Sequence, residues 1–123
     1  MKYTYEINSE KHTIEVTTIG DLMTTEVAAM ALEIMTKAKT LKYKIVFDYR
    51  QSKNRISIGA AYSWFSTHFD NIDKELKYIP TAYIASMEDW SFYSFFELAS
   101  NNKGICIRVF QEKNAAMKWL ESL

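Results

Sequence analysis

The stretch Lys42-Tyr-Lys-Ile-Val-Phe-Asp-Tyr-Arg50 predicts the central strand of the fold. Within it, Ile45, Val46 and Phe47 form an unbroken apolar run with charged residues on both sides. Such a run is typical of a strand that is covered by helices on both faces. Helical patterns precede and follow it, as an α/β sheet requires. Its polar end, Asp48-Tyr49-Arg50, falls where open α/β sheets form a ligand crevice.

The segments before the central strand predict a hairpin and a helix. Apolar and polar residues alternate over residues 3–7 and again over 12–19, which is the period of a half-buried strand. Residues 8–11 between them have turn composition, so the two strands should form an antiparallel hairpin. Gly20 predicts the end of the second strand. Apolar residues at helical spacing then follow over 24–39.

The remainder of the chain continues the alternation of strands and helices. The order β-β-α-β-α-β-α-β-α predicts an α/β fold: a five-stranded, mostly parallel sheet with an antiparallel edge strand from the N-terminal hairpin, and four helices on both faces. A chain of 123 residues without repeats or linkers forms a single domain over residues 1–123. The predicted elements after the central strand are a polar loop over 51–55, a helix from Ser57, a strand over 81–85, a helix capped by Asp89 and reaching Ser100, a strand over 105–110 and a helix over 112–123.

Composition excludes several classes of protein. Fifteen acidic and fifteen basic residues leave no net charge, so nucleic-acid binding is not expected. One cysteine, Cys106, cannot form an internal disulfide and fits a reducing compartment. No segment approaches the about 20 apolar residues of a membrane span. We therefore expect a cytoplasmic protein without an integral membrane segment.

Four local motifs, spread over nearly the whole chain, carry a family resemblance. They are Gly20-Asp-Leu-Met-Thr-Thr-Glu26, Ile45-Val-Phe-Asp-Tyr-Arg50, Ile79-Pro-Thr-Ala-Tyr-Ile-Ala-Ser-Met-Glu-Asp-Trp90 and Ile107-Arg-Val-Phe-Gln-Glu-Lys-Asn-Ala-Ala-Met-Lys-Trp-Leu120. Together they resemble the SpoIIAA-like family, relatives of the STAS (anti-sigma-factor antagonist) fold. The resemblance implies a non-enzymatic domain without a cofactor. Some relatives act in protein-partner switching, and others are thought to hold apolar ligands or to touch membranes.

One departure from the family pattern concerns phosphorylation. Switch proteins of the STAS fold carry an Asp-Ser-Ser-Gly turn at the start of the second helix, and its second serine accepts the phosphate. The corresponding stretch here is Ile56-Ser57-Ile58-Gly59, with an isoleucine at the acceptor position. Isoleucine cannot carry the added charge through which phosphorylation acts. We therefore do not expect the family's switch, although Ser57 remains an alternative acceptor.

The titratable residues do not assemble a catalytic or metal motif. Asp48 could act as a general base only with a partner, and the sequence offers none nearby, so a structural ion pair or a loop anchor is the favoured interpretation. His12 and His68 are far apart and lack other ligands at metal-binding spacing. Cys106 lies in a buried strand pattern and is most simply a small core residue.

Aromatic residues are concentrated in the second and third predicted helices. Phe92, Phe95, Phe96 and Ala99 predict one core-facing stripe, with Trp90 and Tyr93 outside it. One interpretation is a thick core with amphipathic rings at its margin. The other is that these rings border an apolar pocket or an exposed patch.

The leading hypothesis is a non-enzymatic domain that holds an apolar small molecule or a lipid between these two helices. The alternative is a protein–protein regulatory or homodimeric module that lacks the phospho-serine switch. An enzyme would require Asp48 and a second polar group in one cleft. The candidate ligand-binding residues are Tyr62, Trp64, Phe65, Trp90 and Tyr93, with Asp48, Arg50 and Ser57 as candidate polar anchors.

Overall fold

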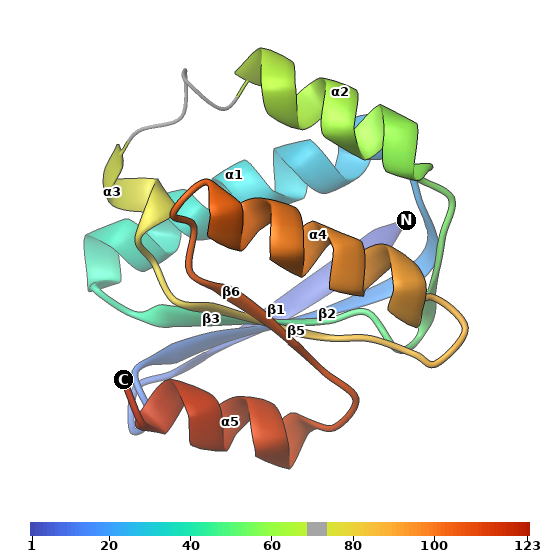
Figure 1. The fold of residues 1–123 in the computed structure, drawn as a ribbon. Coiled ribbons are helices and arrows are strands. Elements are labelled where there is room, and N and C mark those ends of the chain that lie inside the picture. Colours follow the sequence, from blue (N-terminus) through green and yellow to red (C-terminus); the bar gives the residue numbers. More distant parts are fainter. Residues whose placement is uncertain (69–73) are drawn as a thin grey trace.

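The computed structural model describes residues 1–68 and 74–123, without the side chain of Phe65. The strands are β1 (Lys2–Asn8), β2 (Thr13–Leu22), β3 (Lys44–Asp48), β4 (Ser52–Asn54), β5 (Thr81–Ile84) and β6 (Ile107–Phe110), and the helices are α1 (Thr24–Leu41), α2 (Ile58–His68), α3 (Lys74–Lys77), α4 (Trp90–Asn102) and α5 (Lys113–Glu121) (Figure 1). The sheet has the order β1-β2-β3-β5-β6, and β4 pairs with β2 beside this path. β1 and β2 are antiparallel, and the other neighbours are parallel. The predicted α/β class and antiparallel edge strand are confirmed.

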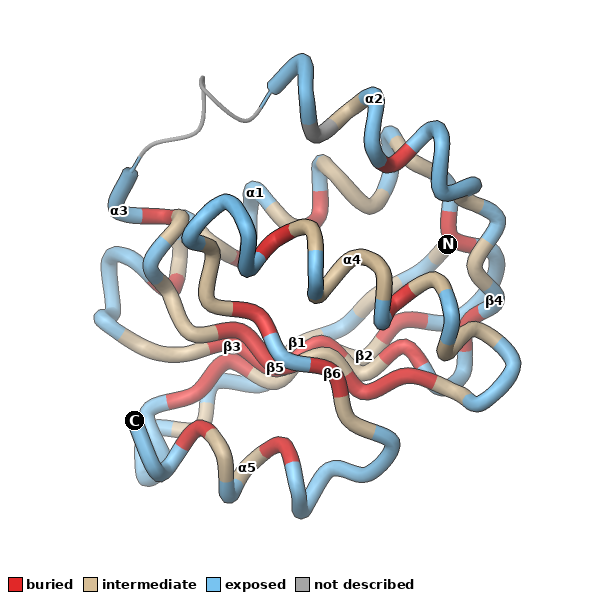
Figure 2. Tube along the Cα trace, in the orientation of Figure 1, coloured by how far each residue is buried: buried red, intermediate tan, exposed pale blue. Residues whose placement is uncertain are grey.

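The helices cover the two faces of the sheet unequally. Figure 1 shows α5 alone below the sheet, with α1 to α4 above it. Because side chains alternate along a strand, Ile45 and Phe47 of β3 enter the large core on the α1 side. Val46 enters a smaller core with Ala116 and Leu120 of α5. The buried residues in Figure 2 accordingly lie along the strands and on the inner sides of α1, α4 and α5.

β2 is longer than the sequence predicted, because Gly20 does not end it. The strand continues to Leu22, and Gly20 adopts a φ of 98°, which a glycine accepts without strain. Before this point β2 pairs with β3, and beyond it with β4. The buried hydroxyls of Thr18 and Ser52 lie 2.6 Å apart where the pairing changes. The predicted polar loop over 51–55 therefore contains a short strand, β4, and the sheet has six strands instead of the predicted five.

The helix predicted from Ser57 is α2. Ser57 precedes its first residue, and its Oγ accepts the backbone N–H of Ala60 at 3.0 Å, which is the bond of a helix N-cap. The sequence pattern predicts Phe69 on the apolar stripe of this helix, with Ile72 and Leu76 in a last, less regular turn; Phe69 and Ile72 fall outside the described residues. Leu76 is buried, and the structure places it on the short helix α3 instead of an irregular turn. In Figure 1, α2 lies farther from the sheet than α1 and α4.

The buried side of α4 differs from the predicted one. Tyr93 was expected outside the core stripe, yet it is only 4% exposed, while the phenylalanines of that stripe are half-buried. The reason is the aromatic surface of the sheet below α4. Tyr93 stacks on Tyr49 with 5.3 Å between ring centroids and meets Tyr83 edge-on at 6.1 Å. Helical spacing alone could not select this side, because α4 is apolar around much of its circumference.

Candidate functional site

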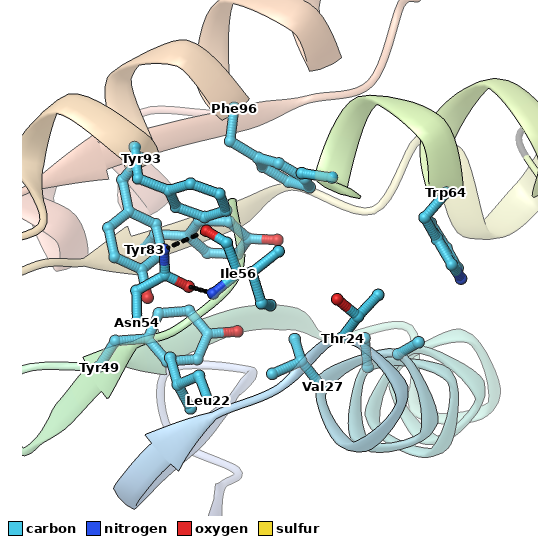
Figure 3. A pocket seen from close by; sticks show the side chains of 14 residues that line it. Leu22, Thr24, Val27, Tyr49, Asn54, Ile56, Trp64, Tyr83, Tyr93 and Phe96 are labelled. Atoms are coloured by element: carbon cyan, nitrogen blue, oxygen red, sulfur yellow. Dashed lines mark hydrogen bonds between the residues drawn. The ribbon is translucent and has the colours of Figure 1, made fainter. Parts of the chain in front are cut away.

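A partly open, apolar cavity of about 100 Å³ lies between the sheet and three helices. Figure 3 shows the rings of Tyr49, Tyr83 and Tyr93 together on one side of it, across from Thr24, Val27 and Trp64. Apolar concave spaces of this kind are the usual sites of small-molecule binding. The cavity is lined by Leu22, Thr24, Val27, Ala28, Ala31, Tyr49, Asn54, Ile56, Ala61, Trp64, Tyr83, Phe92, Tyr93 and Phe96.

Two tyrosines from the sheet form the base of the cavity. Tyr49 follows the last residue of β3, and Tyr83 is the third residue of β5, so both lie near the carboxyl ends of parallel strands. Their rings meet edge-on at 5.4 Å, and Tyr83 stacks on Phe96 of α4 at 5.8 Å. Contacts of this geometry stabilise aromatic pairs by about 0.5–1.5 kcal/mol beyond the area that they bury. The base of the cavity is therefore a rigid aromatic surface.

Hydroxyl groups without hydrogen-bond partners are contributed to the cavity by Tyr49, Tyr83, Tyr93 and Thr24 among the described residues. Within the described part of the chain, the hydroxyls of Tyr49, Tyr83 and Tyr93 form no hydrogen bond. Burial raises the pKa of all three above the ordinary value of 10.0. They are therefore neutral at physiological pH, and each can donate one hydrogen bond. No charged side chain lines the cavity among the described residues.

The rim of the cavity is fixed by the loop that follows β4. The side-chain amide of Asn54 donates to the carbonyl of Ile56 at 2.8 Å and accepts its N–H at 3.2 Å. The backbone N–H of Asn54 donates to the Asp89 carboxylate at 2.9 Å. The sequence predicted Asp89 as a helix cap, but it forms no side-chain cap bond. Its carboxylate instead joins the start of α4 to the rim.

Small residues on the helices leave the space that the cavity occupies. Ala28 and Ala31 of α1 and Ala61 of α2 line it, where larger side chains would fill it. Trp64 of α2 provides the outer wall, and its ring stacks on His68 at 5.0 Å. The cavity therefore depends on the position of α2, which approaches the rest of the fold through Ala61 and Trp64.

The predicted ligand-binding residues occupy different places. Trp64 and Tyr93 line the cavity. Trp90 does not; it is half-buried and packs against the large core. Tyr62 is 63% exposed and lies away from the lining, and the side chain of Phe65 falls outside the description.

The predicted polar anchors do not reach the cavity. Both carboxylate oxygens of Asp48 accept bonds from the Arg50 guanidinium, at 3.0 and 2.8 Å. Burial raises the pKa of Asp48, but its bonds with Arg50 outweigh this effect and hold the pKa below its usual value. Asp48 shares the α5 side of β3 with Val46 because of the strand's alternation, so this ion pair lies on the opposite face. Ser57 is exposed at the start of α2.

The histidines and the cysteine are separate from the cavity. His12 and His68 are both exposed, and the described residues contain no group of three potential metal ligands. Cys106 was expected inside a strand, but β6 begins one residue later and Cys106 is only half-buried. Burial raises the pKa of its thiol, despite the opposing effect of Lys44.

Sequence reasoning missed Tyr49 and Tyr83, which form the cavity base. The available signal was strand alternation: Tyr49 shares a face with Ile45 and Phe47, whereas Asp48 faces the other way. Asp48, Tyr49 and Arg50 read as one polar group when only their position after the apolar run is considered. Assigning alternate residues to opposite faces of the strand would have placed Tyr49 beneath α4 and the Asp48–Arg50 pair on the other face.

The solved structures that resemble this chain over nearly its full length include two proteins of low sequence identity. One is an uncharacterized protein of the DUF3478 family with a SpoIIAA-like fold from Shewanella loihica PV-4; it has 17% identity and a TM-score of 0.57, with 97% of this chain and 92% of that chain covered. The fold of this chain is SpoIIAA-like. The other is an anti-sigma factor antagonist from Mycobacterium paratuberculosis, with 10% identity, a TM-score of 0.58 and coverage of 98% and 95%.

The sequence comparisons add no family to this SpoIIAA-like fold. No protein-family model matches the chain, and no curated protein matches it. In the described residues, no helix has the length and apolar character needed to cross a bilayer. The similarity to the two structures therefore defines the fold, and function has to be argued from the cavity.

Proposed function

We propose that this chain is a non-enzymatic binding domain that holds a compact, neutral, mostly apolar molecule with one hydrogen-bonding oxygen. The observation that carries the proposal is the apolar cavity with the unpaired hydroxyls of three tyrosines and of Thr24. These hydroxyls have no protein partner among the described residues, and a ligand oxygen that accepts from one of them would form a hydrogen bond that contributes about 0.5–1.5 kcal/mol. The ligand's body would lie against Phe96, Val27 and Trp64.

The size of the cavity limits the ligand. A dry cavity of about 150 Å³ is known to accept benzene, and this space measures about 100 Å³ and is partly open. It suits a small ring or a short branched chain. A full acyl chain would require α2 to move outward, so a compact ligand is favoured over a lipid.

The charge of the ligand also follows from the lining. An ionised group would lose its hydration without meeting an opposite charge, which costs several kcal/mol or more. The neutral tyrosine hydroxyls can satisfy a carbonyl or hydroxyl oxygen but cannot neutralise an anion. We therefore expect neutral molecules to bind and their ionised analogues to be rejected.

Thermal unfolding with two matched probes tests the proposal. Cyclohexanone is neutral and carries one acceptor oxygen, whereas cyclohexanecarboxylate has a similar body with a full charge. A ligand that binds only the folded state adds about 2.7 kcal/mol of stability at 100 times its Kd. Cyclohexanone should raise the Tm in a concentration-dependent way, and cyclohexanecarboxylate should not.

A cavity-filling variant provides the control for site. In Ala31→Leu the added side chain occupies the cavity, so stabilisation by cyclohexanone should disappear. The matched variant Ala115→Leu makes the same change at an exposed position of α5 and should respond as the original chain does. Equal responses from both variants, or no response in the original chain, would contradict the proposal.

A further inference from the structure

The two edge strands of the sheet, β1 and β6, differ in whether their outer backbone groups have hydrogen-bond partners. At one edge, the backbone N–H of Val109 in β6 donates to the Glu97 carboxylate of α4 at 2.7 Å. At the other edge, β1 has β2 as its one strand neighbour in the described part. No side chain among residues 1–68 and 74–123 forms a hydrogen bond to the backbone of β1. An unpaired edge of seven residues is a template for another strand.

We propose that two copies of this chain pair their β1 strands antiparallel, which extends the sheet across a two-fold axis. The register is centred on Thr4, so that Lys2 of each copy lies opposite Glu6 of its partner copy. Lys2, Thr4 and Glu6 are all exposed on one face of β1. Two identical Lys–Glu pairs thus form by symmetry, as an isologous interface requires.

Charge favours this register over those centred on Lys2 or on Glu6. A register centred on Glu6 would bring two carboxylates together, and one centred on Lys2 would bring two ammonium groups together. Opposite charges on directly paired residues stabilise a sheet, and like charges destabilise it. On the other face, the same register pairs Tyr3 with Tyr5 of the partner copy, a favourable aromatic cross-strand pair.

An apolar groove beside β1 fits the same partner. It runs between β1 and the outer side of α1, and its lining includes Ile7, Leu32 and Leu41, which are 50%, 60% and 40% exposed. A two-fold axis perpendicular to the sheet places both α1 helices on the same face of the extended sheet. The α1 helix of the partner copy would therefore cover these leucines from the side, with Ala29 and Thr36 leaving room for close approach.

The groove and the ligand cavity lie on different sides of α1, so this inference is independent of the proposed function. The cavity uses Val27, Ala28 and Ala31 of α1, whereas the groove uses Ala29, Leu32 and Thr36. Loss of the dimer would leave the cavity in place. If the cavity bound no ligand, the open edge of β1 would still be available to pair with a second copy.

Charge reversal on β1, followed by sedimentation equilibrium of the full chain, tests the pairing. The original chain should dimerise reversibly, and Lys2→Glu and Glu6→Lys should each raise the dimer Kd by about tenfold or more, because two attractive pairs become repulsive. An equimolar mixture of the two variants should recover the dimer as a mixed species. Lys118→Glu, an exposed reversal on α5, should leave the Kd unchanged.

A second pair of variants tests the groove. Leu32→Asp and Leu98→Asp change leucines of equal exposure, 60%, on α1 and α4. Leu32→Asp should dissociate the dimer, and Leu98→Asp should not. A chain that stays monomeric at millimolar concentration would overturn the proposal, as would a dimer whose Kd is the same in Lys2→Glu, Glu6→Lys and Leu32→Asp.

Discussion

The Tyr93 hydroxyl should contribute to ligand binding but not to the stability of the fold. The Tyr93 residue is buried on α4, and its hydroxyl forms no hydrogen bond within the described residues. Removing a hydroxyl that has no protein partner takes no hydrogen bond away from the folded state. Tyr93→Phe should therefore leave the free energy of unfolding unchanged or raise it by up to about 1 kcal/mol, while weakening the binding of cyclohexanone.

Chemical denaturation and probe titration measure these two effects on one variant. Tyr78→Phe is the control, because Tyr78 is 66% exposed and outside the cavity lining. It should change neither quantity. A loss of stability in Tyr93→Phe would show that its hydroxyl has a structural partner, and the account of the cavity's free polar groups would then be wrong.

The Glu15 carboxylate joins three elements and should make stability depend on pH. Its oxygens lie 2.6 Å from Nζ of Lys113 and accept bonds from Asn8 at 3.0 Å and Thr13 at 3.2 Å. Burial raises the pKa of Glu15, but these partners outweigh burial and hold the pKa below 4.5.

A carboxyl whose pKa is lowered by folding stabilises the native state above its unfolded pKa, and loses that contribution as the pH falls through the folded pKa. Glu15→Gln should therefore lower the free energy of unfolding by about 1 kcal/mol at pH 7. The difference from the original chain should shrink below pH 4.5. Denaturation curves at several pH values, with exposed Glu10→Gln as the control, would measure it; a pH-independent difference would contradict this explanation.

At the scale of elements, the end of α1 departs from the usual helix stop. Lys42 follows the helix in the left-handed conformation, with φ of 60° and ψ of 42°, and its N–H and that of Tyr43 bond to carbonyls of the last turn. Glycine adopts this conformation without the penalty that a Cβ atom imposes. Lys42→Gly should therefore raise the free energy of unfolding by about 0.5–1 kcal/mol.

Lys42→Ala is the matched variant, because it removes the same exposed side chain but keeps the Cβ atom. It should give no gain in chemical denaturation. If both variants stabilised the chain equally, the benefit would come from removing the lysine and not from the backbone conformation.

The elements that the sequence predicted well are those with one dominant period. The unbroken run at Ile45 to Phe47 and the alternation in the N-terminal hairpin located β1, β2 and β3, because each pattern fits a single environment. The prediction that Gly20 ends the second strand was wrong, because a glycine can either end a strand or allow the strand to change its pairing partner. The buried side of α4 was ambiguous for another reason: aromatic residues surround that helix, and only the tyrosines beneath it select Tyr93.

At the scale of the whole molecule, the cavity is a tertiary feature that no local pattern contains. Trp64 and Tyr93 were identified because aromatic residues are concentrated in their helices. The base of the cavity is formed by Tyr49 and Tyr83, which lie near the ends of strands that are distant in sequence. Their meeting requires the parallel pairing of β3 with β5, in which Phe47 lies opposite Tyr83. The space itself exists because Ala31 and its small neighbours on α1 and α2 leave it unfilled.

Native mass spectrometry of the freshly purified chain, with Ala31→Leu prepared in parallel, tests the central claim most directly. A bound molecule should appear as a mass excess that is lost on denaturation and is absent from Ala31→Leu. Identification of the released molecule as neutral and compact would support the cavity as its site. A mass equal to that of the sequence alone, or the same excess in both proteins, would contradict the proposal that this cavity holds a ligand.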